Sequence, residues 1–141
     1  MIPDIEIWVD GGFRGGNSGW AYVVTHKGRI IFVEHGQCAA KNSSHAEEIA
    51  AREALNSEWA NGSRVWVDSY GVQNRLWKLS RIVGSKIYFA GVEKRKTSVP
   101  YKLADRLSSR RKFRLRQRKK ERRKGMRRST EKSSVHSNRR V

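Results

Sequence analysis

Residues 5–12 read Ile-Glu-Ile-Trp-Val-Asp-Gly-Gly. Apolar side chains recur at every second position, which predicts a strand with one buried face. The strand is expected to end at Asp10. Five glycines then fall between positions 11 and 19, and this density predicts a turn. The pattern therefore places a carboxylate at the end of a buried strand.

The other predicted elements alternate between strands and helices. Strands are expected at residues 20–26 and 30–34, joined by a hairpin turn at Lys27-Gly28, and at residues 64–68 and 86–92. Helices are expected from residue 46 to about residue 59, over residues 71–79, and from Ser98-Val99-Pro100 onward. The tetrapeptide Ser44-His45-Ala46-Glu47 is typical of a capping box that opens the first helix.

The order β-β-β-α-β-α-β-α predicts an α/β fold with a mixed five-stranded sheet and helices on its faces. Two strands that are linked through a helix normally run parallel within one sheet. The first and fourth strands are plausible neighbours at the centre of such a sheet. Asp10 and Asp68 would then lie side by side at matching strand ends.

Positive charge is concentrated at the end of the chain. Residues 110–141 hold 16 Lys and Arg against two Glu, whereas residues 1–109 hold 15 Lys and Arg against 11 Asp and Glu. We therefore expect a globular domain over residues 1–109 and a basic tail over residues 110–141, flexible when unbound. Nucleic acid is the polyanion that such a tail fits best. A membrane surface fits less well because the tail has few apolar residues, and a merely solvated charge run is the plainest alternative.

The lone cysteine, Cys38, excludes a disulfide framework and a zinc knuckle. The first residues lack the basic start and apolar core of a signal peptide, and no apolar stretch is long enough to span a membrane. We expect an intracellular, cytoplasmic protein.

Four carboxylates occur where a metal site could form: Asp10, Glu47, Asp68 and Asp105. Two end predicted strands and two lie in predicted helices, so all four could converge. Crowded carboxylates repel one another, and a divalent cation relieves that repulsion. Hard oxygen ligands favour Mg²⁺ or Mn²⁺, and two such ions can act on a phosphodiester.

Each carboxylate also has a purely structural interpretation. Glu47 could be the capping-box partner of Ser44. Asp10 and Asp68 could accept backbone N–H bonds in turns. Asp105 could pair with a neighbouring cation on a solvated helix face. The argument for a metal site rests on the ordered set of four.

The ordered set resembles the ribonuclease H family, within the wider group of two-metal polynucleotidyl transferases. The matching segments are residues 9–12, 43–55, 65–69 and 102–107, which together span residues 5 to about 109. The resemblance implies a nuclease that hydrolyses the RNA strand of RNA/DNA hybrids with two Mg²⁺ (or Mn²⁺) ions. It also implies that Asp10, Glu47, Asp68 and Asp105 are the catalytic metal ligands. Residues that match family contacts to DNA phosphates and RNA 2′-hydroxyls are Asn17, Asn42, Ser43 and Ser44.

Two departures from the family pattern bear on activity. Residues 93–97 contain no histidine where family members often have one, so Lys94, Arg95 or Lys96 would act there only electrostatically, and turnover could be slow. Only 17 residues separate Asp68 from Lys86, which leaves no room for the extra basic helix of larger bacterial enzymes.

We expect the basic tail to replace that helix in holding nucleic acid. The first cations of the tail are Arg110, Arg111, Lys112, Arg114 and Arg116. Trp77 is the tryptophan that we expect against a sugar of the substrate, whereas Trp8 and Trp66 are expected to pack on the sheet.

Three alternatives remain open at this point. The chain could be a non-catalytic nucleic-acid clamp of a ribonucleoprotein, a related resolvase or RNA-processing nuclease, or a small basic ribosomal-type protein. The intact set of carboxylates favours the hybrid nuclease, and we expect a monomer.

Overall fold

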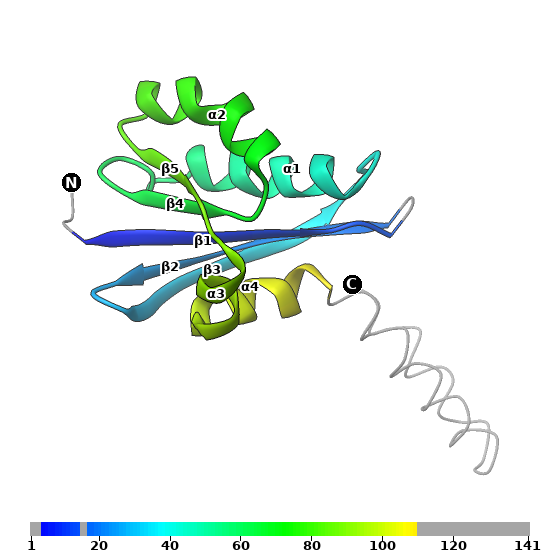
Figure 1. Cartoon of the computed structure of the whole chain (residues 1–141), viewed down its shortest axis with the longest axis horizontal. Helices are drawn as coiled ribbons and strands as arrows, with labels where there is room; N and C mark the ends of the chain where they lie inside the picture. Colours follow the sequence, from blue (N-terminus) through cyan, green and yellow to red (C-terminus); the bar gives the residue numbers. More distant parts are fainter. Residues whose placement is uncertain (1–3, 15–16, 110–141) are drawn as a thin grey trace, which may run out of the picture. The chain divides into compact units, whose positions relative to one another are not determined.

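The computed structural model describes residues 4–14 and 17–109 of the chain (Figure 1). The elements in chain order are β1 (Ile5–Gly12), β2 (Ser18–His26), β3 (Arg29–Cys38), α1 (Ser43–Leu55), β4 (Arg64–Val67), α2 (Tyr70–Ile82), β5 (Lys86–Phe89), α3 (Val92–Thr97) and α4 (Val99–Ser108). The predicted basic tail, residues 110–141, lies outside the described residues and remains a prediction.

The five strands form one mixed sheet in the order β3-β2-β1-β4-β5. β1 pairs antiparallel with β2 and parallel with β4, and β4 pairs parallel with β5. The expected fold class and the central pairing of the first and fourth strands are therefore confirmed.

Helices cover both faces of the sheet, with α1 and α2 on one side and α3 and α4 on the other (Figure 1). The larger core joins apolar side chains of the four strands β1, β2, β4 and β5 to the alanines of α1 and to Val72 and Leu76 of α2. A smaller core lies under α4, where Ala104 packs near Ala21 and Val23 of β2. Within the described part of the chain, no helix is both long and apolar enough to cross a membrane.

Two glycines at the end of β1 let helix backbones approach the strand closely. A Cβ atom on Gly11 would collide with the backbone of Ala46 and Glu47 in α1. On the other face, a Cβ on Gly12 would lie 2.9 Å from the carbonyl oxygen of Ser108 in α4. The two glycines at the end of β1 therefore determine how closely the backbones of α1 and α4 approach the sheet at this point.

The first helix begins differently from the sequence prediction. Its N-cap is Asn42, whose side chain accepts a hydrogen bond from the backbone N–H of His45 at 2.8 Å. Ser44 lies inside the helix, and Glu47 bonds elsewhere, so the predicted capping box is wrong. An asparagine caps as well as a serine does, and the tertiary contacts of Glu47 decide between them. The helix ends at Leu55, four residues before the expected position.

The segment after β5 also differs from expectation. β5 ends at Phe89, not at residue 92, and residues 92–97 form the short helix α3 where a loop was expected. A run of Glu, Lys and Arg has good helix propensity. The segment is short and has no apolar periodicity, however, so its sequence pattern does not predict a helix. The helix predicted over residues 71–79 is longer and spans Tyr70–Ile82.

Candidate metal centre

Three carboxylates from three elements meet where β1 and β4 end. Asp10 lies on β1, Glu47 lies on α1, and Asp68 follows β4 directly. Each residue contributes one carboxylate oxygen, and these three oxygens lie within 4.8 Å of one another. Trp8 of β1 pairs with Trp66 of β4, and these neighbouring strands run parallel. Asp10 and Asp68 each lie two residues beyond this pair. The strand register therefore accounts for the proximity that the sequence suggested.

Glu47 connects the ends of the two strands. Its Oε2 accepts a hydrogen bond from the backbone N–H of Gly11, and its Oε1 accepts one from the backbone N–H of Asp68, both at 3.1 Å. The side chain is only 3% exposed. The close approach of α1 to Gly11 allows a buried glutamate to reach the strand backbone. Glu48, by contrast, forms ion pairs with Arg52 and Arg75.

Two hydroxyl groups of α4 contact the cluster from the opposite face. The Ser108 hydroxyl donates to Oδ2 of Asp10 at 2.7 Å. The Tyr101 hydroxyl lies 3.2 Å from Oδ1 of Asp10 and 3.0 Å from Oδ2 of Asp68, so it bridges the two carboxylates. Neither residue was singled out from the sequence. Their spacing around Asp105, four residues before and three after, places all three on one helix face and is the signal that could have revealed them.

Burial makes the ionised state of this cluster costly. It is the largest cause that raises the pKa of Asp10 from its usual 3.8 to about 8, opposed by the Ser108 hydrogen bond and reinforced by the charges of Asp68 and Asp105. Burial, followed by the charges of Asp68 and Asp10, also raises the pKa of Glu47 well above its usual value. Burial and the same carboxylates raise the pKa of Tyr101, so its hydroxyl stays a hydrogen-bond donor.

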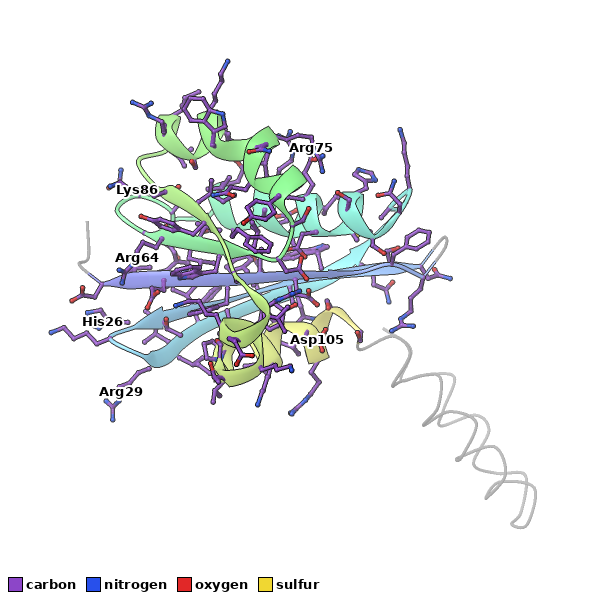
Figure 2. All side chains as sticks on the ribbon, viewed as in Figure 1. His26, Arg29, Arg64, Arg75, Lys86 and Asp105 are labelled. Atoms are coloured by element: carbon purple, nitrogen blue, oxygen red, sulfur yellow. The ribbon has the colours of Figure 1, made fainter. Side chains whose placement is uncertain are left out.

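Asp105 lies on α4 (Figure 2). Its side chain is exposed, and it is not among the three carboxylates that share a single set of close oxygens. Its charge nevertheless contributes to the raised pKa of Asp10, so the two carboxylates are near neighbours. The four acidic residues predicted from the sequence thus occupy one region, with oxygens of three of them within 4.8 Å of one another and Asp105 beside Asp10.

The cations predicted from residues 94–96 lie in three different environments on α3. Arg95 forms an ion pair with Asp68, with 3.5 Å between Nη1 and Oδ2. The ammonium group of Lys94 lies 4.0 Å from the ring centroid of Trp66, and it also faces Trp8. Lys96 is exposed. Of the three, Arg95 is the one that reaches the acidic cluster.

The polar residues predicted to contact nucleic acid flank the same end of the sheet. Asn17 is exposed just before β2, and Asn42 and Ser43 are exposed at the start of α1. Ser44 accepts a hydrogen bond from Arg75 of α2 at 2.8 Å. Asn42 therefore has a structural role as a helix cap, which does not prevent its exposed surface from meeting a ligand.

Trp77 lies on α2, two turns from the end of β4. The residue is 42% exposed, and the guanidinium of Arg81 lies 5.7 Å from the ring centroid. Trp77 is therefore accessible but separate from the carboxylates. The predicted contacts Arg110, Arg111, Lys112, Arg114 and Arg116 lie outside the described residues.

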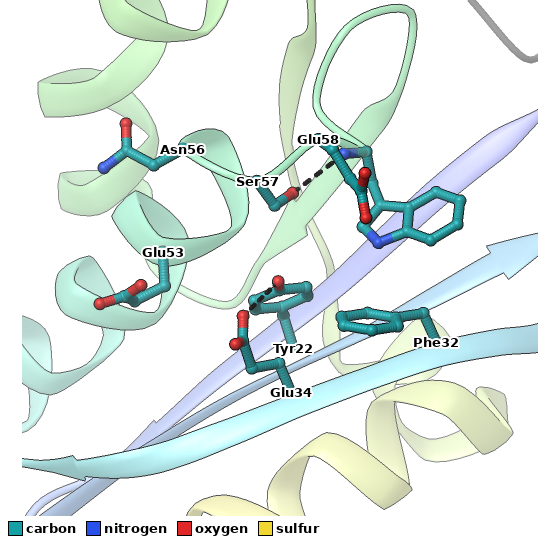
Figure 3. Close-up of a pocket in the computed structure, with 8 residues that line it drawn as sticks. Tyr22, Phe32, Glu34, Glu53, Asn56, Ser57 and Glu58 are labelled. Carbon is teal, nitrogen blue, oxygen red and sulfur yellow. Dashed lines mark hydrogen bonds between the residues drawn. The ribbon is translucent and has the colours of Figure 1, made fainter.

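A hollow of about 270 Å³ lies at the C-terminal end of α1, away from the acidic cluster (Figure 3). Aromatic rings of Tyr22, Phe32 and Trp59 line it together with carboxylates of Glu34 and Glu53. These carboxylates would repel phosphate, so the hollow does not fit a nucleic-acid backbone.

The donor set of the acidic cluster fits a divalent cation. Buried carboxylates with raised pKa values gain most from a positive charge placed between them. All three donors are hard oxygen ligands of the kind that Mg²⁺ and Mn²⁺ prefer. Asp10, Glu47 and Asp68 are therefore the residues that would hold such an ion.

No protein-family model matches the sequence, and no curated protein matches it. The fold, by contrast, resembles many solved structures. RNase H1 from the halophilic archaeon Halobacterium salinarum NRC-1 is 16% identical with a TM-score of 0.60, and the match covers 74% of this chain and 94% of that chain. LC11-RNase H1 in complex with an RNA/DNA hybrid is 18% identical with a TM-score of 0.56, over 75% of this chain and 94% of that chain.

The N-terminal RNase H domain of rv2228c from Mycobacterium tuberculosis is 18% identical with a TM-score of 0.52, over 74% of this chain and 90% of that chain. Identities of this size carry the fold alone, and the strand order and helix placement described above agree with it. The described part of this chain has the ribonuclease H fold.

Proposed function

We propose that this protein is a metal-dependent endonuclease that hydrolyses the RNA strand of RNA/DNA hybrids. The observation that carries the proposal is the convergence of Asp10, Glu47 and Asp68 at the end of two parallel central strands. A protein that only bound nucleic acid would gain nothing from buried carboxylates that face phosphates. The similar fold of LC11-RNase H1, solved with an RNA/DNA hybrid, supports this choice of substrate.

In this proposal Asp10, Glu47 and Asp68 hold divalent cations, with Asp105 completing the set at the rim. Two bound Mg²⁺ or Mn²⁺ ions would supply an activated water and stabilise the charge on the leaving oxygen. The three carboxylates would determine where the cations sit. Glu47 is held by two backbone N–H groups, so the distance between the ends of β1 and β4 is set before a substrate arrives.

The proposed nucleic-acid surface extends from the metal centre along the same end of the sheet. Asn17, Asn42, Ser43 and Ser44 lie at this end and offer neutral polar groups for phosphates and 2′-hydroxyls. The basic tail would add non-specific attraction to the phosphate backbone. We also propose a cytoplasmic, monomeric protein with a separate tail after residue 109.

The test is cleavage of an end-labelled RNA/DNA hybrid in Mg²⁺ or Mn²⁺, beside single-stranded RNA, duplex RNA and duplex DNA. Glu47→Gln is compared with Glu53→Gln, which makes the same change at an exposed position of the same helix. We expect metal-dependent cleavage of the hybrid alone, loss of at least about 100-fold in Glu47→Gln, and wild-type rates in Glu53→Gln.

A non-catalytic clamp is the second candidate, and the Arg95–Asp68 ion pair favours it because a fixed cation already neutralises one of the acids. Tight hybrid binding without cleavage of any substrate, in either metal, would establish the clamp and overturn the nuclease.

A further inference from the structure

The Tyr101 hydroxyl occupies the space between two carboxylates that the proposed function assigns to a cation. Tyr101 is the third residue of α4, and its backbone N–H is capped by the Ser98 side chain at 3.1 Å. Its oxygen lies within hydrogen-bond distance of Asp10 Oδ1 and Asp68 Oδ2. The first turn of α4 therefore holds the phenol over the acidic cluster.

A phenol has one hydrogen to donate, and here two acceptor oxygens share it. Asp68 Oδ2 also faces Arg95, whereas Asp10 Oδ2 accepts from Ser108. The carboxylate oxygens that face the cluster are thus already engaged with positive or hydrogen-bearing groups of the protein. A cation that bound both carboxylates would compete with Tyr101 for them.

We propose that Tyr101 is a positioning residue whose hydroxyl holds Asp10 and Asp68 together and competes with a divalent cation for their oxygens. This inference rests on the proposed function, which makes those carboxylates metal ligands. Tyr101 keeps the two side chains together without a cation, at the cost of weaker cation binding. The wild-type chain should therefore bind a divalent cation more weakly than a chain that lacks this hydroxyl.

The first test measures cation affinity without nucleic acid. Full-length wild type, Tyr101→Phe and Asp10→Asn are titrated with Mn²⁺ by isothermal titration calorimetry. Tyr88→Phe is the matched control, because its ring packs on Trp66 in β4 and it removes the same hydroxyl outside the cluster. We expect Tyr101→Phe to bind Mn²⁺ about tenfold more tightly than wild type and Tyr88→Phe to bind as wild type does, with binding lost in Asp10→Asn.

A second measurement does not depend on the variant folding. The chain has four tyrosines, and NMR of wild type labelled at the tyrosine Cζ carbons reports the hydrogen bonding of each hydroxyl. We expect one resonance to shift on addition of Mg²⁺, and we expect that resonance to be absent from Tyr101→Phe. Single Phe replacements of the other three tyrosines assign it by elimination if Tyr101→Phe does not fold.

Equal or weaker Mn²⁺ binding by Tyr101→Phe, while wild type binds and Asp10→Asn does not, overturns the role of Tyr101 and leaves the proposed function intact. An unchanged Tyr101 resonance in a Mg²⁺-saturated wild type overturns it as well. Absence of Mn²⁺ binding by both wild type and Tyr101→Phe overturns the metal site itself, and the inference fails with it.

Discussion

Glu47 and Gly11 are joined by a hydrogen bond between a buried carboxylate and a strand backbone N–H, at 3.1 Å, although they belong to different layers of the fold. The bond exists because Gly11 has no side chain to separate α1 from β1. This pair therefore links the packing of α1 on β1 to the carboxylate cluster. A change at either residue should affect both the stability of the fold and the geometry of the cluster.

Gly11→Ala should destabilise the protein by about 1–3 kcal/mol, because the added methyl group would collide with the backbone of α1. Urea unfolding without metal measures the loss. Gly91→Ala is the control, since a Cβ at Gly91 would meet open space. Similar losses in both variants would show that α1 does not depend on the approach at Gly11.

Stability of the metal-free protein should fall as pH rises from about 4 to 8. The folded state holds the Asp10 proton up to a pKa of about 8, whereas an unfolded aspartate releases it near 3.8. The unfolded state therefore binds fewer protons in this range, and rising pH favours unfolding. Asp10→Asn should flatten the dependence and be more stable than wild type at pH 8 by at least about 1–2 kcal/mol. Parallel pH curves for the two proteins would contradict the raised pKa.

Addition of Mn²⁺ should raise the melting temperature more at pH 8 than at pH 5. Protons and cations compete for the same carboxylates, and the raised pKa values of Asp10 and Glu47 extend that competition toward neutral pH. Thermal unfolding with and without Mn²⁺ at both pH values measures the difference. A larger shift at pH 5 would place the bound ion elsewhere.

Much of this arrangement could be predicted from the sequence, because strand patterns and helix links determine which strands run parallel. That pattern alone predicts that Asp10 and Asp68 lie side by side. The cap of α1 was mispredicted, since Asn42 and Ser44 have nearly equal capping propensity and only the tertiary bonds of Glu47 distinguish them. The spacing of Tyr101 and Asp105 places them on one helix face, but the contact of Tyr101 with Asp10 spans 91 positions and also depends on how α4 docks on the sheet.

Trp77→Ala should weaken binding of an RNA/DNA hybrid by about tenfold if the exposed ring stacks on a sugar or base. Ile82→Ala, an equally simple truncation at an exposed position of the same helix, should bind as wild type. Fluorescence anisotropy with a labelled hybrid, at fixed salt, gives both affinities. Equal binding by the two variants would show that the Trp77 ring makes no contact with the hybrid.

Removal of residues 110–141 should lower hybrid affinity and reduce its dependence on salt. The removed segment carries 16 cations and two carboxylates, and each phosphate contact contributes a slope of roughly 0.9 in log affinity against log salt on duplex DNA. Affinity measured from low to high salt, with full-length protein beside it, gives the slope. Identical slopes would show that the basic tail makes no phosphate contacts.

The paired glycines of β1 have a consequence for where chemistry can arise in this fold. Gly11 and Gly12 face opposite sides of the sheet, so the backbones of α1 and α4 both come down onto the strand at one level. Side chains of both layers therefore reach the end of β1 at this level, Glu47 from α1 and Ser108 from α4. The location of the reactive point along the strand is then a property of the framework, whereas the reactivity at that point depends on which side chains the two helices carry there.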